Sequence, residues 1–566
     1  MKKTYWFITA TLVLLFFLCG VGSASAEGRP FVTKWNCKKG KEVPIPIIGT
    51  YKMLITDASG QEKVNETVTV ADANHPYIFK PTEDGIYTVT AGPEGVERIQ
   101  TENRNYIELI EVVQFGTVEW TSMEKAFQRC LNMTFAENID IPNLSKVTSM
   151  SNMFFDCNAF NSSLKGWDVS HVTNMWGMFS NCTSFNQSLE GWDVSKVTDM
   201  SQMFSDCTSF NQSLEGWDVS KVTDMRQMFF DCTSFNQSLG SWKIKTVVGS
   251  LGKTAMSVEN YSKSLVGWAE WAKKSDIRDI HFGDNVKGLV YNAKGKAARA
   301  ELIKRGWIFE GDIEQTFEVT LVPPEHGTLA IEGYTTETLK KVSDETELTV
   351  TATTTEEGYE LKELQVNGKK LEGKKFKVTG ATTVTAVFGL KTFPVTASVK
   401  DGKGGTVSLT GAANLDAVEY GTTLTVVATP DEANGYKLKS VTVNGTPLAE
   451  GVKTFEVKEA KTVEVEFALK TFPVTKELKG VTKGEITITG AANLDAVEYG
   501  TELTVEATTT EEGYELKEIQ VNGTKLEGTT FKVTGEAKVT AVFGLKTFPV
   551  TASVKDGKGG TVSLTG

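Results

Sequence analysis

The sequence predicts a multidomain α+β protein with a short N-terminal β-sandwich, a solenoid of short α/β repeats with a helical cap, and tandem all-β repeat domains. Three observations predict this fold class. Tryptophan and phenylalanine recur with a period of 25 residues in the middle of the chain, a Thr-Phe-x-Val-Thr motif recurs further on, and the segment before both alternates as β-strands do. Fixed periods of about 20–50 residues are typical of repeat architectures.

The first 26 residues are predicted to form a cleaved signal peptide. Lys2 and Lys3 precede an apolar run that ends near Val21, and Ala24 to Ala26 offer a small-residue cleavage site. A retained membrane anchor is the less favoured alternative, because this run is short for a spanning helix. No later run approaches the roughly 20 apolar residues of such a helix, so we expect a secreted or cell-surface protein without a membrane span in its mature chain.

The charge balance and the scarcity of histidine argue against several functions. With 71 acidic and 59 basic residues, the chain would repel the backbone of a nucleic acid. Its four histidines lie in separate segments, with no partner at the spacing of a metal site or a catalytic triad. The sequence therefore predicts no enzymatic activity, no metal and no cofactor.

Each 25-residue unit is predicted to contain one short strand and one short helix. From Leu214 the spacing Leu-x-x-Trp-x-Val-x-x-Val matches the frame of leucine-rich repeats, and Trp217 and Val219 would point inward from the strand. The apolar residues ahead of that strand share the spacing of one helix face: Met200, Met203, Phe204 and Cys207. Stacked units of this leucine-rich-repeat-like kind share a continuous core.

The outward strand positions are the predicted binding site. One aspartate and one serine per coil would line the concave face: Asp168, Ser170, Asp193, Ser195, Asp218 and Ser220. A solenoid presents this face to its partners, which favours a protein-binding stripe, and the alternative is a solvated surface without a ligand. Calcium is not expected, because one carboxylate per coil falls short of the six to eight oxygens that this ion takes.

Two further columns of side chains receive a structural interpretation. The cysteines would stack as packed thiols: Cys157, Cys182, Cys207 and Cys232. Parallel side chains aim poorly for disulfides and a straight ladder cannot surround zinc, so both of these alternatives are less favoured. The asparagines would point inward and hydrogen-bond the turns of adjacent coils: Asn161, Asn186, Asn211 and Asn236.

Both ends of the repeat region are expected to be covered. Before it, Tyr51–Thr56 and Gly85–Thr90 are the clearest strands of a small sandwich. After it, Ser257 can cap a helix, and a second helix is predicted over Ala297–Ile303. Such caps cover the apolar ends that a stack of repeats would otherwise expose.

The C-terminal part is predicted to be a row of small antiparallel β-domains. In each full unit, Asn-Gly between alternating stretches predicts a hairpin. Residues 546–566 repeat residues 391–411 without a change and end in mid-domain, so we expect the chain to be part of a longer product. The predicted segments are the signal peptide 1–26, the β-sandwich-like domain 27–117, the solenoid 118–255, its helical cap 256–315, β-repeats 316–391, 392–470 and 471–546, and a truncated β-repeat 547–566.

The 25-residue units resemble a known family. Their motif, Trp-Asp-Val-Ser-x-Val-Thr-Asp-Met-x-x-Met-Phe-x-x-Cys-x-Ser-Phe-Asn-Gln-Ser-Leu, is similar to that of the BspA-like leucine-rich-repeat surface proteins of bacteria, and the resemblance extends over residues 115–312. The start of the chain resembles polycystic-kidney-type β-domains, although Thr56–Gly60 replaces their Trp-Gly-Asp-Gly turn. The later units are similar to divergent internalin-type B-repeats.

The resemblance implies an exported, cell-associated bacterial protein that contacts host proteins or neighbouring cells. The leading hypothesis is an adhesin-like protein whose sandwich and solenoid bind a protein partner, while the β-repeats form a stalk. The alternative is a structural surface or spacer protein without a dedicated ligand. An extracellular hydrolase is least favoured, because the sequence carries neither H-E-x-x-H nor G-x-S-x-G.

Overall fold

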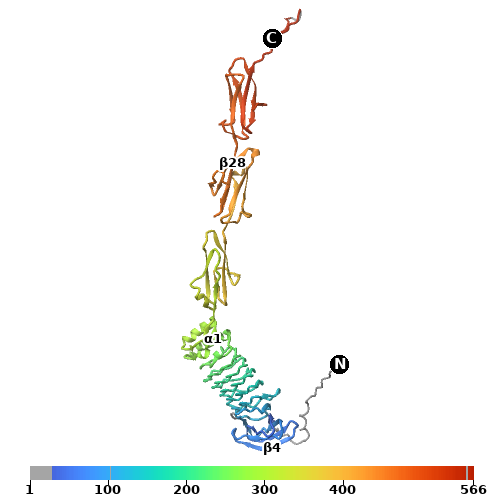
Figure 1. Ribbon diagram of the computed structural model, residues 1–566, viewed down its shortest axis with the longest axis vertical. Helices are drawn as coiled ribbons and strands as arrows, with labels where there is room; N and C mark the ends of the chain where they lie inside the picture. Colours follow the sequence, from blue (N-terminus) through green and yellow to red (C-terminus); the bar gives the residue numbers. More distant parts are fainter. Residues whose placement is uncertain (1–27, 102–103, 556–558, 566) are drawn as a thin grey trace, which may run out of the picture. The chain divides into compact units, whose positions relative to one another are not determined.

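The structure is a computed structural model that describes residues 28–101, 104–555 and 559–565 (Figure 1). The predicted signal peptide, residues 1–26, lies outside the described residues. The chain divides into two compact units, of which the first holds the residues up to 319 together with 335–348 and 377–382, and the second holds the rest. None of the helices in the described ranges is long and apolar enough to cross a membrane.

The N-terminal region is built around one main sheet. Its strands are β1 (Phe31–Cys37), β3 (Ile47–Asp57), β4 (Glu62–Val70), β6 (Gly85–Ala91), β7 (Val96–Ile99), β8 (Leu109–Gln114) and β9 (Thr134–Phe135). They pair in the order β4-β3-β6-β1-β8-β9 with β7 beside β3, while β2 (Val43–Ile45) pairs with β5 (Tyr77–Phe79). The strands predicted at 51–56 and 85–90 are confirmed within β3 and β6.

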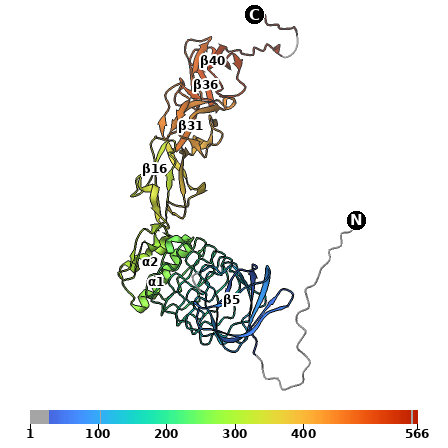
Figure 2. The ribbon, with the colours of Figure 1, turned by 60° about the horizontal axis from the view of Figure 1, so that its bottom comes forward.

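This sheet runs into the coils of the repeat region. The last strand, β9, pairs in parallel with β8. The N–H of Thr101 donates to the carbonyl of Lys125 at 3.0 Å. Buried residues from Phe31 to Phe309 form one continuous hydrophobic core through the sheet, the coils and the helices that follow (Figure 2). The first coil is therefore covered by the N-terminal sheet, as a stack of repeats requires.

The strand predicted at Trp-Asp-Val is wrong. Residues 192–194 form no strand, Gly191 precedes them with a φ of 87°, and the N–H of Val197 donates to the Val194 carbonyl in a turn at 2.9 Å. Local turns thus satisfy backbone groups that a strand would have paired with the next coil. The coils are joined by isolated parallel bridges at a later position of each repeat: Ser149, Asn174, Asp199 and Asp224.

The helix predicted over the Met-Phe segment is also wrong, although its four apolar side chains are fully buried. Consecutive turns replace it. The N–H of Met203 donates to the Met200 carbonyl at 3.2 Å, whereas the N–H of Phe204 crosses to the Met228 carbonyl of the next coil at 3.0 Å. Gln202, with a left-handed φ of 57°, keeps this segment flat. Cross-coil hydrogen bonds therefore take the amides that an α-helix would have satisfied internally.

Stacked aromatic rings fill the interior of the coils. Phe179 and Phe204 lie 5.8 Å apart with an interplanar angle of 4°, and Phe229 continues the column at 5.9 Å. Within one coil, Phe204 stacks on Phe210 at 4.2 Å. Burying each of these side chains contributes about 1.5–3 kcal/mol before the cost of ordering it. The ring columns therefore hold successive coils at one separation.

Helices cover the other end of the coils (Figure 2). The cap contains α1 (Val258–Ser275), α2 (Ala293–Ile303), the short helices Leu251–Lys253 and Asp284–Val286, and the parallel pairs of β10 (His281–Gly283) with β12 (Ile308–Phe309) and β11 (Val290–Tyr291) with β13 (Ile313–Glu314). The Ser257 hydroxyl accepts the N–H of Asn260, which confirms the predicted helix start. The second predicted helix is confirmed within α2.

Three small β-domains follow. The first contains β14 (Thr316–Phe317), β15 (Val319–Leu321), β16 (Gly327–Ile331), β17 (Val342–Ser343), β18 (Glu347–Thr354), β19 (Tyr359–Val366), β20 (Lys369–Lys370), β21 (Lys375–Lys377) and β22 (Thr382–Leu390). The second contains β23 (Thr392–Phe393), β24 (Val395–Val399), β25 (Gly405–Thr410), β26 (Val418–Glu419), β27 (Thr423–Pro430), β28 (Tyr436–Val443), β29 (Thr446–Pro447), β30 (Thr454–Glu456) and β31 (Lys461–Leu469). The third contains β32 (Thr471–Phe472), β33 (Val474–Lys479), β34 (Gly484–Thr489), β35 (Val497–Glu498), β36 (Glu502–Thr509), β37 (Tyr514–Val521), β38 (Thr524–Lys525), β39 (Thr530–Lys532) and β40 (Ala537–Leu545).

The second and third β-domains share one topology. Each has a four-stranded sheet, β24-β31-β28-β29 or β33-β40-β37-β38, and a three-stranded sheet, β25-β27-β30 or β34-β36-β39. The predicted Asn-Gly hairpin is confirmed, since Val443 pairs with Thr446 across it. Not every pair is antiparallel, because β24 runs parallel to β31 and β33 parallel to β40. The described residues after β40 form no strand.

Candidate binding groove

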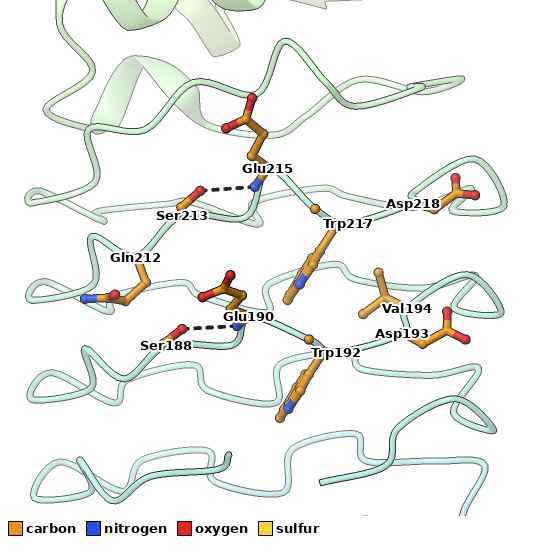
Figure 3. Close-up of a pocket in the computed structure, with 12 residues that line it drawn as sticks. Ser188, Glu190, Trp192, Asp193, Val194, Gln212, Ser213, Glu215, Trp217 and Asp218 are labelled. Carbon is orange, nitrogen blue, oxygen red and sulfur yellow. Dashed lines mark hydrogen bonds between the residues drawn. The ribbon is translucent and has the colours of Figure 1, made fainter. Parts of the chain in front are cut away.

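An open groove of about 710 Å³ lies across two adjacent coils of the repeat region (Figure 3). Equivalent positions line it from the two coils: Ser188, Glu190, Gly191, Trp192, Asp193 and Val194 from one, and Gln212, Ser213, Glu215, Gly216, Trp217 and Asp218 from the next. Both coils carry the sequence Ser-Leu-Glu-Gly-Trp-Asp here. The groove therefore presents most of its chemical groups twice, one coil apart.

Local turns fix the glutamates at the opening of the groove. The N–H of Glu190 donates to the Ser188 hydroxyl at 3.2 Å, and the N–H of Glu215 donates to the Ser213 hydroxyl at 3.3 Å (Figure 3). Both glutamate side chains are exposed. Because the serines hold the backbone and not the carboxylates, the two carboxylates are left to interact with whatever enters the groove.

The two tryptophans of the groove are buried, yet their indole N–H groups have no partner. Trp192 is 5 % exposed and Trp217 is 4 % exposed, and neither Nε1 atom makes a hydrogen bond. In Figure 3 each indole extends from its own coil toward the preceding one, with the nitrogen near its far end. The next tryptophan in the column, Trp242, does donate its Nε1–H, to the Leu214 carbonyl at 2.9 Å. A buried N–H without an acceptor costs about 1–3 kcal/mol, which a ligand carrying an acceptor would recover.

The charge of the groove has one sign. Four carboxylates line it, from Glu190, Asp193, Glu215 and Asp218, and none of its lining residues is basic. The Ser195 hydroxyl and N–H lower the pKa of Asp193, and Ser220 lowers that of Asp218 in the same way. Both aspartates therefore stay ionised in neutral solution, and the groove attracts positively charged groups.

The structure places the predicted aspartates and serines on turns and not on a concave strand. Asp168 accepts the N–H of Ser170 through its Oδ1 atom at 3.0 Å, and Asp193 with Ser195 and Asp218 with Ser220 repeat this geometry. These are Asx turns, in which the carboxylate completes the backbone. Their position follows from the glycine turn ahead of each tryptophan, which ends the extended course that a strand would need.

Only part of the predicted set comes together in the groove. Asp193 and Asp218 line it, whereas Asp168, Ser170, Ser195 and Ser220 do not. Sequence reasoning missed the glutamates and the edges of the two tryptophans. A comparison of the four coils would have found them, because the residue two positions before tryptophan is Lys165, Glu190, Glu215 and Gly240 in turn. Acidic residues thus occupy this position only in the two coils that form the groove.

The cysteine column is inert. The cysteines of residues 28–555 are free and buried: Cys37, Cys130, Cys157, Cys182, Cys207 and Cys232. The thiol of Cys207 donates to the Phe179 carbonyl at 2.9 Å, and burial raises its pKa well above the ordinary value. A thiol that resists ionisation is a poor nucleophile and a poor metal ligand. Among the described residues no group of three or more potential ligands could hold a metal ion.

The asparagine column forms the predicted hydrogen bonds between coils. The Oδ1 atom of Asn211 accepts the N–H of Asn236 at 2.8 Å and the side-chain amide of Gln237 at 3.0 Å. The ladder ends on the cap, where Asn236 accepts the N–H of Ser257 at 2.7 Å. The prediction that these side chains point inward is wrong, because Asn161 and Asn186 are exposed. The ladder runs along the surface of the coils.

Comparison with known proteins assigns both kinds of repeat. Residues 121–242 and 165–268 match a family described as "Mycoplasma protein of unknown function, DUF285". Residues 317–392, 395–471 and 475–547 match the "Divergent InlB B-repeat domain". No curated protein matches the chain.

Two solved structures show a distant likeness. The Bacillus anthracis TIE protein is 10 % identical, with 51 % of this chain and 67 % of that chain covered and a TM-score of 0.18. The open conformation of the pilus adhesin SpaC from Lactobacillus rhamnosus GG is 10 % identical, with 42 % of this chain and 44 % of that chain covered and a TM-score of 0.15. TM-scores this low do not establish a shared fold. The assignment therefore depends on the family matches, which make the chain a repeat protein in which DUF285 repeats precede three divergent InlB B-repeat domains.

Proposed function

We propose that this protein is a secreted or cell-surface bacterial adhesin-like protein that binds a protein partner through the groove of its repeat region. The coils form a leucine-rich-repeat-like solenoid of the BspA type, and the B-repeats serve as a stalk. The predicted signal peptide supports export. The presence of internalin-type B-repeats supports a place at the cell surface.

The unpaired indole N–H groups of Trp192 and Trp217 carry this proposal. A partner that supplied hydrogen-bond acceptors to both would relieve the cost of two unsatisfied buried donors. The four carboxylates of the groove would meet basic side chains of the same partner. A polypeptide with lysine or arginine side chains and exposed carbonyl groups offers both kinds of group, which is why we propose a protein as the ligand.

The chemistry of the groove favours binding over catalysis. Its lining residues include no histidine, cysteine or lysine that could act as a base beside a nucleophile. The hydroxyls of Ser188 and Ser213 already accept backbone N–H groups. We therefore propose that the protein is not an enzyme.

A structural spacer without a ligand is the second candidate. The asparagine ladder and the ring columns favour it, because these bonds hold the coils together without any partner. In the spacer, the two unpaired indoles would be a tolerated loss of stability. Only a binding measurement separates the two candidates.

The experiment is a binding assay on residues 27–566, the chain without its predicted signal peptide. Immobilised extracellular-matrix and cell-surface proteins are titrated with the wild type and with the variant Glu190→Gln/Glu215→Gln, which keeps the backbone turns and removes two charges. Saturable binding that this variant weakens supports the adhesin. Folded protein that binds none of the panel favours the spacer.

A further inference from the structure

Two tyrosines of the B-repeats each lie against a glycine of the repeat before. Tyr420 of the second repeat covers Gly358 of the first, and Tyr499 of the third covers Gly435 of the second. A Cβ atom on either glycine would overlap the tyrosine ring. Both glycines are buried and have left-handed φ values of 86° and 78°. These positions therefore demand glycine for two reasons, the backbone conformation and the space taken by the ring.

Hydrogen bonds repeat at both contacts. The Tyr420 hydroxyl donates to Oε1 of Glu357 at 2.9 Å, and the Tyr499 hydroxyl donates to the Ala433 carbonyl at 3.2 Å. The linking lysine joins both sides. The N–H of Lys391 donates to the Gly358 carbonyl at 2.8 Å, and its own carbonyl accepts the N–H of Tyr420 at 2.9 Å. Lys470 makes the same two bonds, with Gly435 and Tyr499, at 2.7 and 2.9 Å.

The first B-repeat has aspartate where the others have tyrosine. Strand pairing fixes the equivalence, because Val342, Val418 and Val497 pair with the phenylalanine that opens each repeat. Asp344 stands two residues after Val342, as the tyrosines do after their valines. Its Oδ2 atom accepts the N–H of Ala293, the first residue of α2, at 3.2 Å. The same position thus contacts the preceding domain in all three repeats, with a side chain suited to that neighbour.

The third repeat carries the same surface without a tyrosine on it. Gly513 has a left-handed φ of 87°, as Gly358 and Gly435 do, but it is exposed and a Cβ atom there would meet nothing within 4 Å. The N–H of Lys546 still donates to the Gly513 carbonyl at 2.8 Å. Half of the contact is therefore in place.

We infer that this tyrosine is the docking residue that fixes each B-repeat to the one before it. The surface around Gly513 is then a docking site for a further B-repeat that carries tyrosine at the same position. A repeat of the second repeat's kind is the occupant that fits, because residues 546–566 begin with the sequence of residues 391–411. An adhering or a spacer protein would gain the same benefit, which is a row of domains that resists bending at its joints.

Trypsin cleavage of residues 27–566 tests the occupied joints, because each joint contains one linking lysine. Cleavage of a native protein follows the fraction of time that the site is open. Tyr420→Ala is expected to speed cleavage after Lys391 roughly tenfold and to leave cleavage after Lys470 unchanged, since a buried aromatic contact is lost at one joint only. Tyr499→Ala is expected to do the reverse. Unchanged cleavage in both variants would overturn the inference.

A second pair of variants separates docking from folding. Tyr420→Phe keeps the ring over Gly358 and is expected to leave cleavage after Lys391 within about twofold of the wild type, because the exposed hydroxyl bond contributes little. Cleavage after Lys374 and Lys375, inside the first repeat, reports unfolding of that repeat. If Tyr420→Ala accelerates cleavage there as much as after Lys391, the tyrosine supports folding and the inference fails.

The open surface is tested by extending the chain. Residues 412–470 are appended after Gly566, which completes a fourth repeat with the sequence of the second. Cleavage after Lys546 is expected to slow to the rate seen after Lys391, and alanine in place of the appended copy of Tyr420 is expected to restore the fast rate. A fourth repeat that leaves Lys546 as sensitive as before would exclude docking at Gly513.

Discussion

The indole N–H of Trp242 donates a hydrogen bond of 2.9 Å to the carbonyl oxygen of Leu214, and this bond has no counterpart at Trp192 or Trp217. The three side chains occupy the same position of successive coils and are all at least 95 % buried. Their difference therefore lies in hydrogen bonding alone. It singles out the two coils that also carry glutamate ahead of the tryptophan.

Phenylalanine at these positions should separate the hydrogen bond from the packing. Trp217→Phe and Trp242→Phe remove the same volume, but only Trp242→Phe loses a bond, so it is expected to cost about 1 kcal/mol more in the free energy of unfolding. Urea titration followed by tryptophan fluorescence measures this, because no tryptophan lies beyond Trp307 and the signal reports the first unit. Equal costs in the two variants would mean that Trp217 also has a partner.

The asparagine ladder is expected to depend on its acceptor oxygen. Asn211→Ala removes the acceptor of the Asn236 N–H and of the Gln237 amide, and should lower the free energy of unfolding by about 1–2 kcal/mol. Asn211→Asp keeps an acceptor oxygen in place and should lose less than half of that. The same urea titration compares them. If the aspartate variant is as unstable as the alanine variant, the ladder does not act through this bond.

The cap should depend on one buried ion pair. Arg299 donates to both carboxylate oxygens of Asp312 at 2.7 and 2.8 Å, and the Asp312 side chain is fully buried. Asp312→Asn leaves the guanidinium without its counter-charge and is expected to cost about 3–5 kcal/mol. The control is Arg278→Gln, since Arg278 pairs with an exposed aspartate, and it should change stability by less than about 1 kcal/mol. A small effect of Asp312→Asn would contradict this account of the cap.

The buried thiols make stability depend on alkaline pH. Burial raises the pKa of Cys207 well above the unfolded value of 9.0, so the folded protein holds this proton more tightly. The contribution is fully present below pH 9 and is lost as the pH rises toward the folded value. The difference in unfolding free energy between the wild type and Cys207→Ala should therefore narrow above about pH 9. A difference that stays constant up to pH 10.5 would show that the thiol does not titrate on unfolding.

Native thiols should also resist labelling. At pH 8 a thiol reagent is expected to leave Cys157, Cys182 and Cys207 unmodified in the native protein and to modify all three in urea. Mass spectrometry of the labelled peptides gives the result for each cysteine. Rapid labelling of the native column would mean that the coils open far more often than their packing implies.

The sequence pattern predicted what is buried better than it predicted the backbone. The spacing of Met200, Met203 and Phe204 correctly identified an apolar face, because burial depends on which side chains recur. It could not tell a helix from a series of turns, since both present residues i, i+3 and i+4 to one side. The choice is made by amides such as that of Phe204, which bond the next coil. That partner lies 24 residues away and leaves no local signal.

The candidate site was only partly predictable for a related reason. Asp193 and Asp218 were recognised as outward residues, which required only the periodicity. That Asp168 stays outside the groove depends on the difference between Lys165 and the two glutamates, which a consensus of the repeats removes. The unpaired indoles of Trp192 and Trp217 needed coordinates, because the sequence of Trp242 looks the same. Deviations from the repeat thus carry the functional information.

The groove is best examined with two matched variants of residues 27–566. Asp193→Asn/Asp218→Asn removes two charges from the groove, whereas Asp168→Asn makes the same change on the same turn outside it, and both keep an acceptor for the Asx turn. Affinity is measured by surface plasmon resonance for whichever panel protein the wild type binds saturably. The groove predicts a Kd raised about tenfold or more by the double variant and within about twofold of the wild type for Asp168→Asn. Equal affinities for all three proteins would contradict it.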